Sequence, residues 1–131
     1  MQPPFIPRTI GIILGTERFA ACVAFYRDVL GLPVWFEKHE LVCLRFGEGN
    51  LMIETGGMAV DRNKHNSENP TMLRFNVDDV AAAAAALSKR GVSIEMKTFN
   101  WGTVATFAGP DGNICKLKNA DDPFFKGILA P

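Results

Sequence analysis

The fold of this chain is decided by residues 25–32, FYRDVLGL, which close the first helix that the sequence predicts. An apolar stripe with helical spacing runs into this stretch, formed by Phe19, Val23, Tyr26 and Leu30. Gly31 follows the stripe and predicts the end of the helix, because glycine adopts the left-handed backbone of a helix terminus at no steric cost. Pro33 comes shortly afterwards and prevents the helix from resuming.

Strand-like segments flank this helix on both sides. They are rich in β-branched and aromatic residues and lie at residues 9–14, 34–38, 40–46 and 51–55. The last two are joined by Gly47-Glu48-Gly49-Asn50, a sequence that suits a hairpin turn. The first half of the chain is therefore predicted to run strand, helix, strand, strand, strand.

The same order of elements returns in the second half. A strand at residues 71–77 leads into Asp78 and Asp79, whose charges suit the positively polarised start of an alanine-rich helix. Gly91 is expected to end this helix as Gly31 ends the first. Three further strands are predicted at residues 92–97, 101–107 and 113–118. The chain thus contains an internal repeat of one β-α-β-β-β unit.

One such unit is too small to bury a core alone, so we expect the two copies to pack together. The predicted fold class is α+β: two tandem βαβββ units form a curved mixed sheet around a central cleft, with the helices outside. Unit one covers about residues 8–56 and unit two about 71–118; a polar loop at 57–70, either a linker or a lid, joins them, and 119–131 form a C-terminal tail. Residues 1–131 are predicted to be a single domain.

Composition excludes several classes of function. Fourteen Lys plus Arg balance fourteen Asp plus Glu, so the chain lacks the basic excess of a nucleic-acid binder. The longest apolar run, residues 80–87, is too short to span a bilayer, and the first residues lack the pattern of a secretory signal. All three cysteines lie in apolar segments: Cys22, Cys43 and Cys115. We expect a cytoplasmic protein with reduced, buried thiols that binds neither nucleic acid nor membranes.

The chain resembles the vicinal oxygen chelate superfamily, which includes glyoxalase I, extradiol dioxygenases and the bleomycin resistance proteins. The resemblance is carried by residues 25–32 and, in the same order, by Asn76-Val77-Asp78-Asp79, Trp101-Gly102 and Gly109-Pro110-Asp111-Gly112-Asn113. It extends from about Thr9 to Lys118, nearly the whole chain. It implies a single vicinal oxygen chelate domain with a small-molecule site in the cleft between the two units.

In the metalloenzymes of this superfamily, four side chains bind one divalent cation at the centre of the cleft. The resemblance places these positions at Gly11, Glu54, Met72 and Lys116. Only Glu54 suits such a cation, because Gly11 has no side chain, and Met72 offers a soft thioether. Lys116 carries the wrong charge. Three of the four ligand positions are lost, so we expect no metal and no other cofactor, although the family includes metal-dependent lyases and dioxygenases.

The remaining site candidates are charged and aromatic residues of the predicted strands. Arg74 occupies an alternate strand position that faces the same cleft as Glu54 and Lys116. Arg74 or Lys116 is expected to bind an anionic or carbonyl oxygen of a ligand, with Glu54 beside them. Trp101 and Phe107 are expected to line an apolar wall of the same ligand site. Glu54 is also the best candidate for a catalytic base.

Two classes of function compete on these residues. The first is a metal-independent small-molecule binding protein, similar to the bleomycin-resistance-type members of the superfamily. The second is an enzyme with a divergent active site: a glyoxalase-like lyase or isomerase, or a dioxygenase-related enzyme. A sheet-edge interaction module without a ligand is a weaker third alternative. The missing metal ligands favour binding, and the expected partner is a small molecule.

A homodimer is also expected. The resemblance implies it, because members of the superfamily commonly pair or exchange their units. The tail adds an argument from the sequence, since residues 123–129, PFFKGIL, carry four large apolar side chains beyond the last predicted strand. Left exposed on a monomer, they would form an unusual apolar patch.

Overall fold

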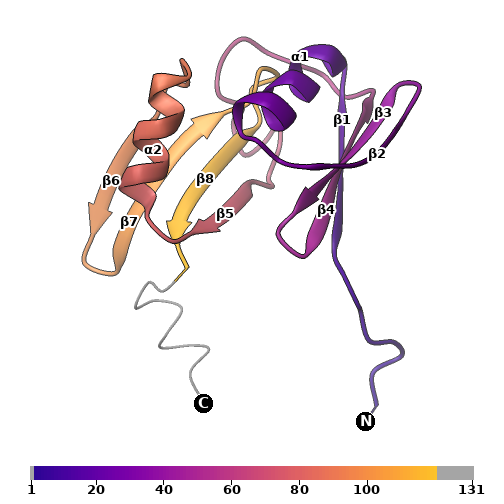
Figure 1. Ribbon diagram of the computed structural model, residues 1–131, viewed down its shortest axis with the longest axis horizontal. Helices are drawn as coiled ribbons and strands as arrows, with labels where there is room; N and C mark the ends of the chain where they lie inside the picture. The colour runs from indigo at the N-terminus through magenta and orange to yellow at the C-terminus, as the bar shows by residue number, and fades with distance from the viewer. Residues whose placement is uncertain (1, 121–131) are drawn as a thin grey trace. The chain divides into compact units, whose positions relative to one another are not determined.

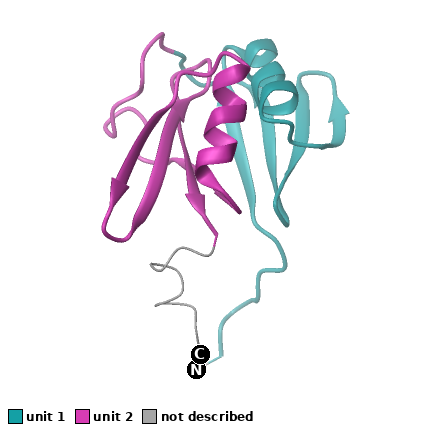
Figure 2. Cartoon of the chain, turned by 60° about the vertical axis from the view of Figure 1, so that its left-hand side comes forward, with its two compact units in different colours: residues 1–59 teal, residues 60–131 magenta. Residues whose placement is uncertain are grey.

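The computed structural model of the protein describes residues 2–120. The chain divides into two compact units, residues 1–59 (unit 1) and residues 60–131 (unit 2) (Figure 2). Each unit contains one four-stranded mixed sheet and one helical segment in the order β-α-β-β-β. The α+β class and the tandem βαβββ repeat are thereby confirmed. The apolar tail segment at residues 123–129 lies outside the described residues.

Unit 1 builds its sheet in the order β1-β4-β3-β2 (Figure 1). Its elements are β1 (Gly11–Thr16), α1 (Phe19–Val23), the π-helical segment η1 (Ala24–Val29), β2 (Val34–Lys38), β3 (Leu41–Phe46) and β4 (Gly49–Thr55). Strand β1 runs parallel to β4, and the other neighbours are antiparallel. The parallel pairing is possible because the helix carries the chain back from β1 to the start of the hairpins.

The helix of unit 1 is less regular than its apolar stripe predicts. After α1 the turns widen, and the amide of Leu30 bonds the carbonyl oxygen of Phe25 at 2.9 Å, one residue further back than in an α-helix. Tyr26 lies in this wide turn with a fully buried side chain, and its ring meets that of Phe25 edge to face at 5.0 Å. The predicted end of the helix is confirmed, since Gly31 has a φ of 78°.

Unit 2 repeats the arrangement with the sheet order β5-β8-β7-β6. Its elements are β5 (Leu73–Val77), α2 (Val80–Lys89), β6 (Glu95–Phe99), β7 (Gly102–Ala108) and β8 (Ile114–Asn119). The side chain of Asp79 caps α2 by accepting a hydrogen bond of 3.1 Å from the amide of Ala82, and Gly91 ends the helix with a φ of 89°. Both helix boundaries agree with the prediction.

Helix α2 crosses one face of this sheet and packs on β7 and β8 (Figure 1). The buried apolar side chains of the unit lie between the helix and these strands, and they are Val80, Ala84, Ala105, Phe107, Cys115 and Leu117. Because strand side chains alternate, the residues between these positions face the opposite side of the sheet, called here the open face.

The polar loop between the repeats makes defined contacts within unit 2. Residues 60–69, called here the strap, run along the hairpin turn at residues 109–113: the amide of Val60 bonds the carbonyl oxygen of Asp111 at 3.1 Å, and that of Lys64 bonds Gly112 at 2.9 Å. The side-chain amide of Asn69 donates to the side-chain oxygen of Asn113 at 2.9 Å. The strap is therefore anchored along its length.

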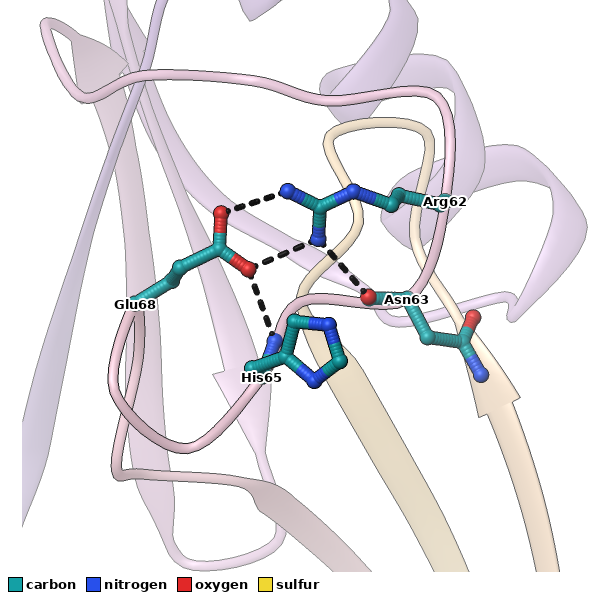
Figure 3. Close-up of polar contacts among 4 residues, drawn as sticks. All are labelled: Arg62, Asn63, His65 and Glu68. Carbon is teal, nitrogen blue, oxygen red and sulfur yellow. Dashed lines mark hydrogen bonds and ion pairs between the residues drawn. The ribbon is translucent and has the colours of Figure 1, made fainter.

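A clasp inside the strap holds its shape (Figure 3). The guanidinium of Arg62 forms two hydrogen bonds, of 2.7 and 2.8 Å, with the two carboxylate oxygens of Glu68. The backbone amide of His65 donates to the same carboxylate at 2.9 Å. These donors stabilise the ionised form and lower the pKa of Glu68 to about 2, with the Arg62 hydrogen bonds as the main cause.

Among residues 2–120, no helix is long and apolar enough to cross a membrane.

Candidate functional site

The open face of the unit 2 sheet carries a cavity of about 710 Å³. All the residues that line it belong to unit 2. Lys116 and Lys118 of β8 reach this face because their neighbours Cys115 and Leu117 are buried toward α2. Strand alternation therefore brings charged side chains from three strands, β5, β6 and β8, to one surface.

A polar row crosses all four strands at one level of the cavity. Its members are direct partners in the strand register and are, in order, Arg74, Lys116, Thr106 and Glu95. The ammonium of Lys116 donates a hydrogen bond of 3.3 Å to the hydroxyl of Thr106. Arg74 of the edge strand β5 lies beside Lys116 of β8, so two cationic groups occupy adjacent positions in this row.

The next row of the open face contains Lys118, Val104 and Lys97. Lys118 is only 5% exposed, although it carries a charge. Lys97 is different, because it forms an exposed ion pair of 3.2 Å with Glu95. Exposed ion pairs contribute little to stability, but this one compensates Glu95, the one carboxylate among the described residues of the lining.

Two aromatic rings close one end of the cavity. Phe99 ends β6 and Trp101 lies in the turn before β7; their rings stack with centroids 4.8 Å apart and an interplanar angle of 4°. The ammonium of Lys118 lies 4.1 Å from the centroid of the Trp101 ring, a cation–π contact that helps to hold a buried charge. Phe99 remains 45% exposed and Trp101 39%, so much of the ring surface faces solvent.

Three of the five predicted ligand-binding residues line this cavity together: Arg74, Lys116 and Trp101. Phe107 does not line it, because it projects from β7 to the α2 side of the sheet and is 2% exposed. The prediction missed Phe99 and Lys118. Counting by twos from Lys116 along β8 would have found Lys118, but the Phe99–Trp101 stack forms across a turn that no strand pattern predicts.

Glu54, the fifth predicted residue and the proposed catalytic base, belongs to unit 1. It lies late in β4, and its register partners are Gly15 of β1 and Leu41 of β3. Arg74 and Lys116, beside which the sequence places Glu54, belong to unit 2, so this part of the expected site stays a prediction.

The four positions that the resemblance assigns to a divalent cation do not fit one here. The side chain of Asn50 already occupies the space beside Gly11, since a Cβ there would lie 3.0 Å from its Oδ1 atom. Met72 precedes β5 and is 44% exposed. Over residues 2–120, no three His, Cys, Asp or Glu side chains gather in a group that could hold a metal ion. The donor set therefore favours a site without a metal, and metal independence stays a prediction.

A family model described as the Glyoxalase/Bleomycin resistance protein/Dioxygenase superfamily matches residues 9–117. A relative from Bacillus subtilis (strain 168), described as "Uncharacterized protein YraH", is 31% identical over 123 residues. That alignment covers 84% of this chain and 96% of the relative.

Two solved structures share the fold. The lactoylglutathione lyase from Agrobacterium tumefaciens is 20% identical with a TM-score of 0.68, and the alignment covers 87% of this chain and 95% of that one. A bleomycin resistance determinant encoded on the transposon Tn5 is 19% identical with a TM-score of 0.67, covering 88% of this chain and 99% of that one. At these identities the likeness establishes the fold alone.

Proposed function

The chain belongs to the Glyoxalase/Bleomycin resistance protein/Dioxygenase superfamily, and we propose that within it the protein acts as a metal-independent small-molecule binding protein. The observation that carries the proposal is the cavity on the open face of unit 2. Its volume of about 710 Å³ is in the range of small-molecule sites, which is roughly 300–1,000 Å³. It also combines aromatic surface with a few polar groups, as such sites do.

The charge at the centre of the cavity supports binding of an organic molecule over a cation. Where the resemblance expects a second metal-binding carboxylate, the cavity has the ammonium of Lys116, with Arg74 beside it. Two adjacent cationic groups repel a divalent metal and attract the oxygens of a ligand. A protein that sequesters a ligand needs a cavity of this kind and no catalytic group.

A thermal-shift screen with organic compounds and divalent metals tests this proposal. We expect glutathione conjugates or aromatic antibiotics to raise the unfolding midpoint, because a ligand that binds only the native state stabilises it. The shift should persist in a chelator. One equivalent of metal in protein purified without added metal, lost on Glu54→Ala, would contradict the proposal and favour a metalloenzyme.

The fate of the bound compound distinguishes an enzyme from a binding protein. Under the binding proposal, a compound that shifts the midpoint is recovered unchanged after long incubation with the protein. Turnover that disappears in Glu54→Gln, while the compound still binds, would instead support a lyase, isomerase or dioxygenase-related enzyme.

We further propose that the protein works as a homodimer in the cytoplasm. All three cysteines are free and buried, which suits a reducing compartment. The argument for the dimer is the apolar sequence of residues 123–129. Light scattering at tens of micromolar should give twice the mass of the chain, and the mass of a monomer would refute the dimer.

A further inference from the structure

We propose that the cavity of unit 2 selects a planar aromatic molecule that carries an anionic group, with an aromatic carboxylate as the simplest case. This inference rests on the proposed binding function and adds the chemical class of the ligand. Three features of the open face carry it: the surplus of positive charge, the donors of Lys116, and the stacked rings at one end.

The lining of the cavity is strongly positive although the whole chain has no net charge. Among residues 2–120, four cationic residues line it, Arg74, Lys97, Lys116 and Lys118, and one carboxylate does, Glu95. Lys97 already compensates Glu95 through their ion pair. The other three cations lie on β5 and β8, where Lys118 is buried. Because charges interact more strongly away from bulk water, an anion bound here gains more than one at the surface.

Lys116 is the residue best placed to bind the anionic group. Its ammonium has three donors, and the hydroxyl of Thr106 accepts one of them. In the part of the chain that the structure describes, no carboxylate forms an ion pair with it. A carboxylate bound at Lys116 would also lie beside Arg74, its register partner on β5. Hydrogen bonds between ionised partners are stronger than neutral ones, so this contact should dominate selectivity.

The stacked rings supply the aromatic part of the site. The exposed surface of Phe99 and Trp101 favours a flat ring, because stacked aromatic pairs are more stable than their buried area alone explains. Lys118 lies between the rings and the polar row: it contacts Trp101 and is two residues beyond Lys116, about 6.6 Å along the strand. A fused two-ring molecule with one carboxylate is therefore long enough to contact Trp101 and Lys116 together.

The test compares three probes of one shape and different charge: naphthalene-2-carboxylate, the neutral 2-naphthamide and the cationic naphthalen-2-ylmethylamine. Trp35 and Trp101 are the only tryptophans of the chain, so a Trp35→Phe background makes the fluorescence report on Trp101. We expect the carboxylate to quench Trp101 and to bind at least about tenfold more tightly than the amide. Added salt should weaken the carboxylate only.

Variants assign the effect to the cavity. Lys116→Gln should weaken the carboxylate by about 10- to 100-fold and leave the amide within about threefold, since a hydrogen bond to a charged group is lost. Arg74→Gln is the second variant and should act in the same direction. Lys38→Gln removes an exposed cation from β2 of unit 1 and is the matched control, which should change neither affinity. The unfolding midpoint of each variant verifies that it is folded.

The outcomes separate this inference from the proposed function. Equal affinity for carboxylate and amide, or a preference for the amine, would refute the selection of anions. Binding of an aromatic molecule at Phe99 and Trp101 would not be refuted by that result. Failure of all three probes, when other compounds still shift the unfolding midpoint, would refute the ligand class alone. Failure of the probes and of the whole thermal-shift screen would refute both.

Discussion

Units 1 and 2 share a backbone plan and differ in what they bury. Both have a four-stranded sheet with one parallel pair and a helix that ends at a glycine with positive φ, Gly31 in one and Gly91 in the other. Among the described residues, those buried in unit 1 are apolar apart from Thr16, whereas unit 2 buries Asp111, Asn113 and Lys118. The strand pairing and the buried face of each sheet are enough to specify this shared backbone arrangement. The other residues of unit 2 are therefore available for polar contacts.

The polar residues of unit 2 are not scattered. Asp111 accepts hydrogen bonds from the backbone amide and the side chain of Asn113, at 3.3 and 3.0 Å, and Asn113 in turn binds the strap through Asn69. Lys118 faces the cavity. Buried polar groups are tolerated when they are hydrogen-bonded, and here they fix a turn and a candidate binding site. The comparison suggests that unit 1 provides apolar packing and unit 2 provides specific polar contacts.

The largest expected effect concerns the apolar core of unit 1. Tyr26→Ala should lower the free energy of unfolding by about 3–5 kcal/mol, because it removes a fully buried aromatic ring from the wide helical turn. Urea denaturation measures the loss. Phe25→Ala, which removes the neighbouring and less buried ring, is the control and should cost less. A similar cost for both would show that burial in the wide turn has no special importance.

Two glycine substitutions in unit 2 compare a helix end, at Gly91, with a hairpin turn that contacts the strap, at Gly112. Gly91 and Gly112 have almost the same φ, 89° and 90°, so replacement by alanine strains both, by about 1–3 kcal/mol. At Gly91 a Cβ would meet nothing within 4 Å, whereas at Gly112 it would collide with the backbone oxygen of Arg62 and with Val60.

Gly112→Ala should therefore cost more than Gly91→Ala in urea denaturation, by about 1–3 kcal/mol of overpacking. Limited proteolysis of the strap gives a second measurement, because a displaced strap exposes its backbone. Equal costs and equal proteolysis rates would show that the strap does not depend on its contact with the turn.

The sequence was sufficient for most of the fold because its signals are local. Glycine ends each helix and an acidic residue caps α2, and these interactions involve neighbours in the chain. Strand boundaries were shifted where a turn was tighter than expected: β4 begins at Gly49 because Gly47 and Glu48 alone form the turn, with Gly47 at a φ of 58°. The wide helical turn at Tyr26 had no sequence signal.

The candidate site was harder to predict, and Phe107 shows why. The sequence suggested a strand from Trp101 to Phe107, and counting by twos along it puts both rings on one face. The strand begins at Gly102, with Trp101 in the preceding turn. The alternation therefore starts after Trp101: Val104 and Thr106 line the cavity, and Phe107 enters the core. One residue at a turn reverses the orientation of every later side chain.

A smaller effect is expected for Lys116. If Lys116 formed a well-buried ion pair with Glu54, its removal would lower the free energy of unfolding by about 3–5 kcal/mol. Lys116 lines a cavity, and within residues 2–120 the acceptor of its ammonium is the Thr106 hydroxyl, so we expect Lys116→Gln to lower the free energy of unfolding by less than about 1 kcal/mol. A double-mutant cycle with Glu54→Gln in urea denaturation measures the coupling directly. A coupling energy above about 2 kcal/mol would establish the pair between the units and contradict this expectation.

The smallest effect concerns the clasp in the strap and depends on pH. The Arg62 guanidinium and the His65 amide lower the pKa of Glu68 from an ordinary 4.5 to about 2. The ionised carboxylate of Glu68 is therefore more stable in the folded state than in the unfolded state, and it adds to the free energy of unfolding. The stabilisation is complete above about pH 4.5 and is lost as the pH falls toward 2. Acid should therefore weaken the native protein more than it weakens Glu68→Gln, which has no carboxylate to protonate.

Urea denaturation of both proteins at pH 6 and pH 3 measures this difference, and Glu48→Gln is the matched control because it removes an exposed carboxylate from the turn between β3 and β4. The difference in the free energy of unfolding between the native protein and Glu68→Gln should be smaller at pH 3 than at pH 6. Titration of the Glu68 side chain by NMR should give a midpoint of about 2. A midpoint near 4.5 would mean that the clasp is open in solution, and the strap would then be held by its backbone contacts to the turn alone.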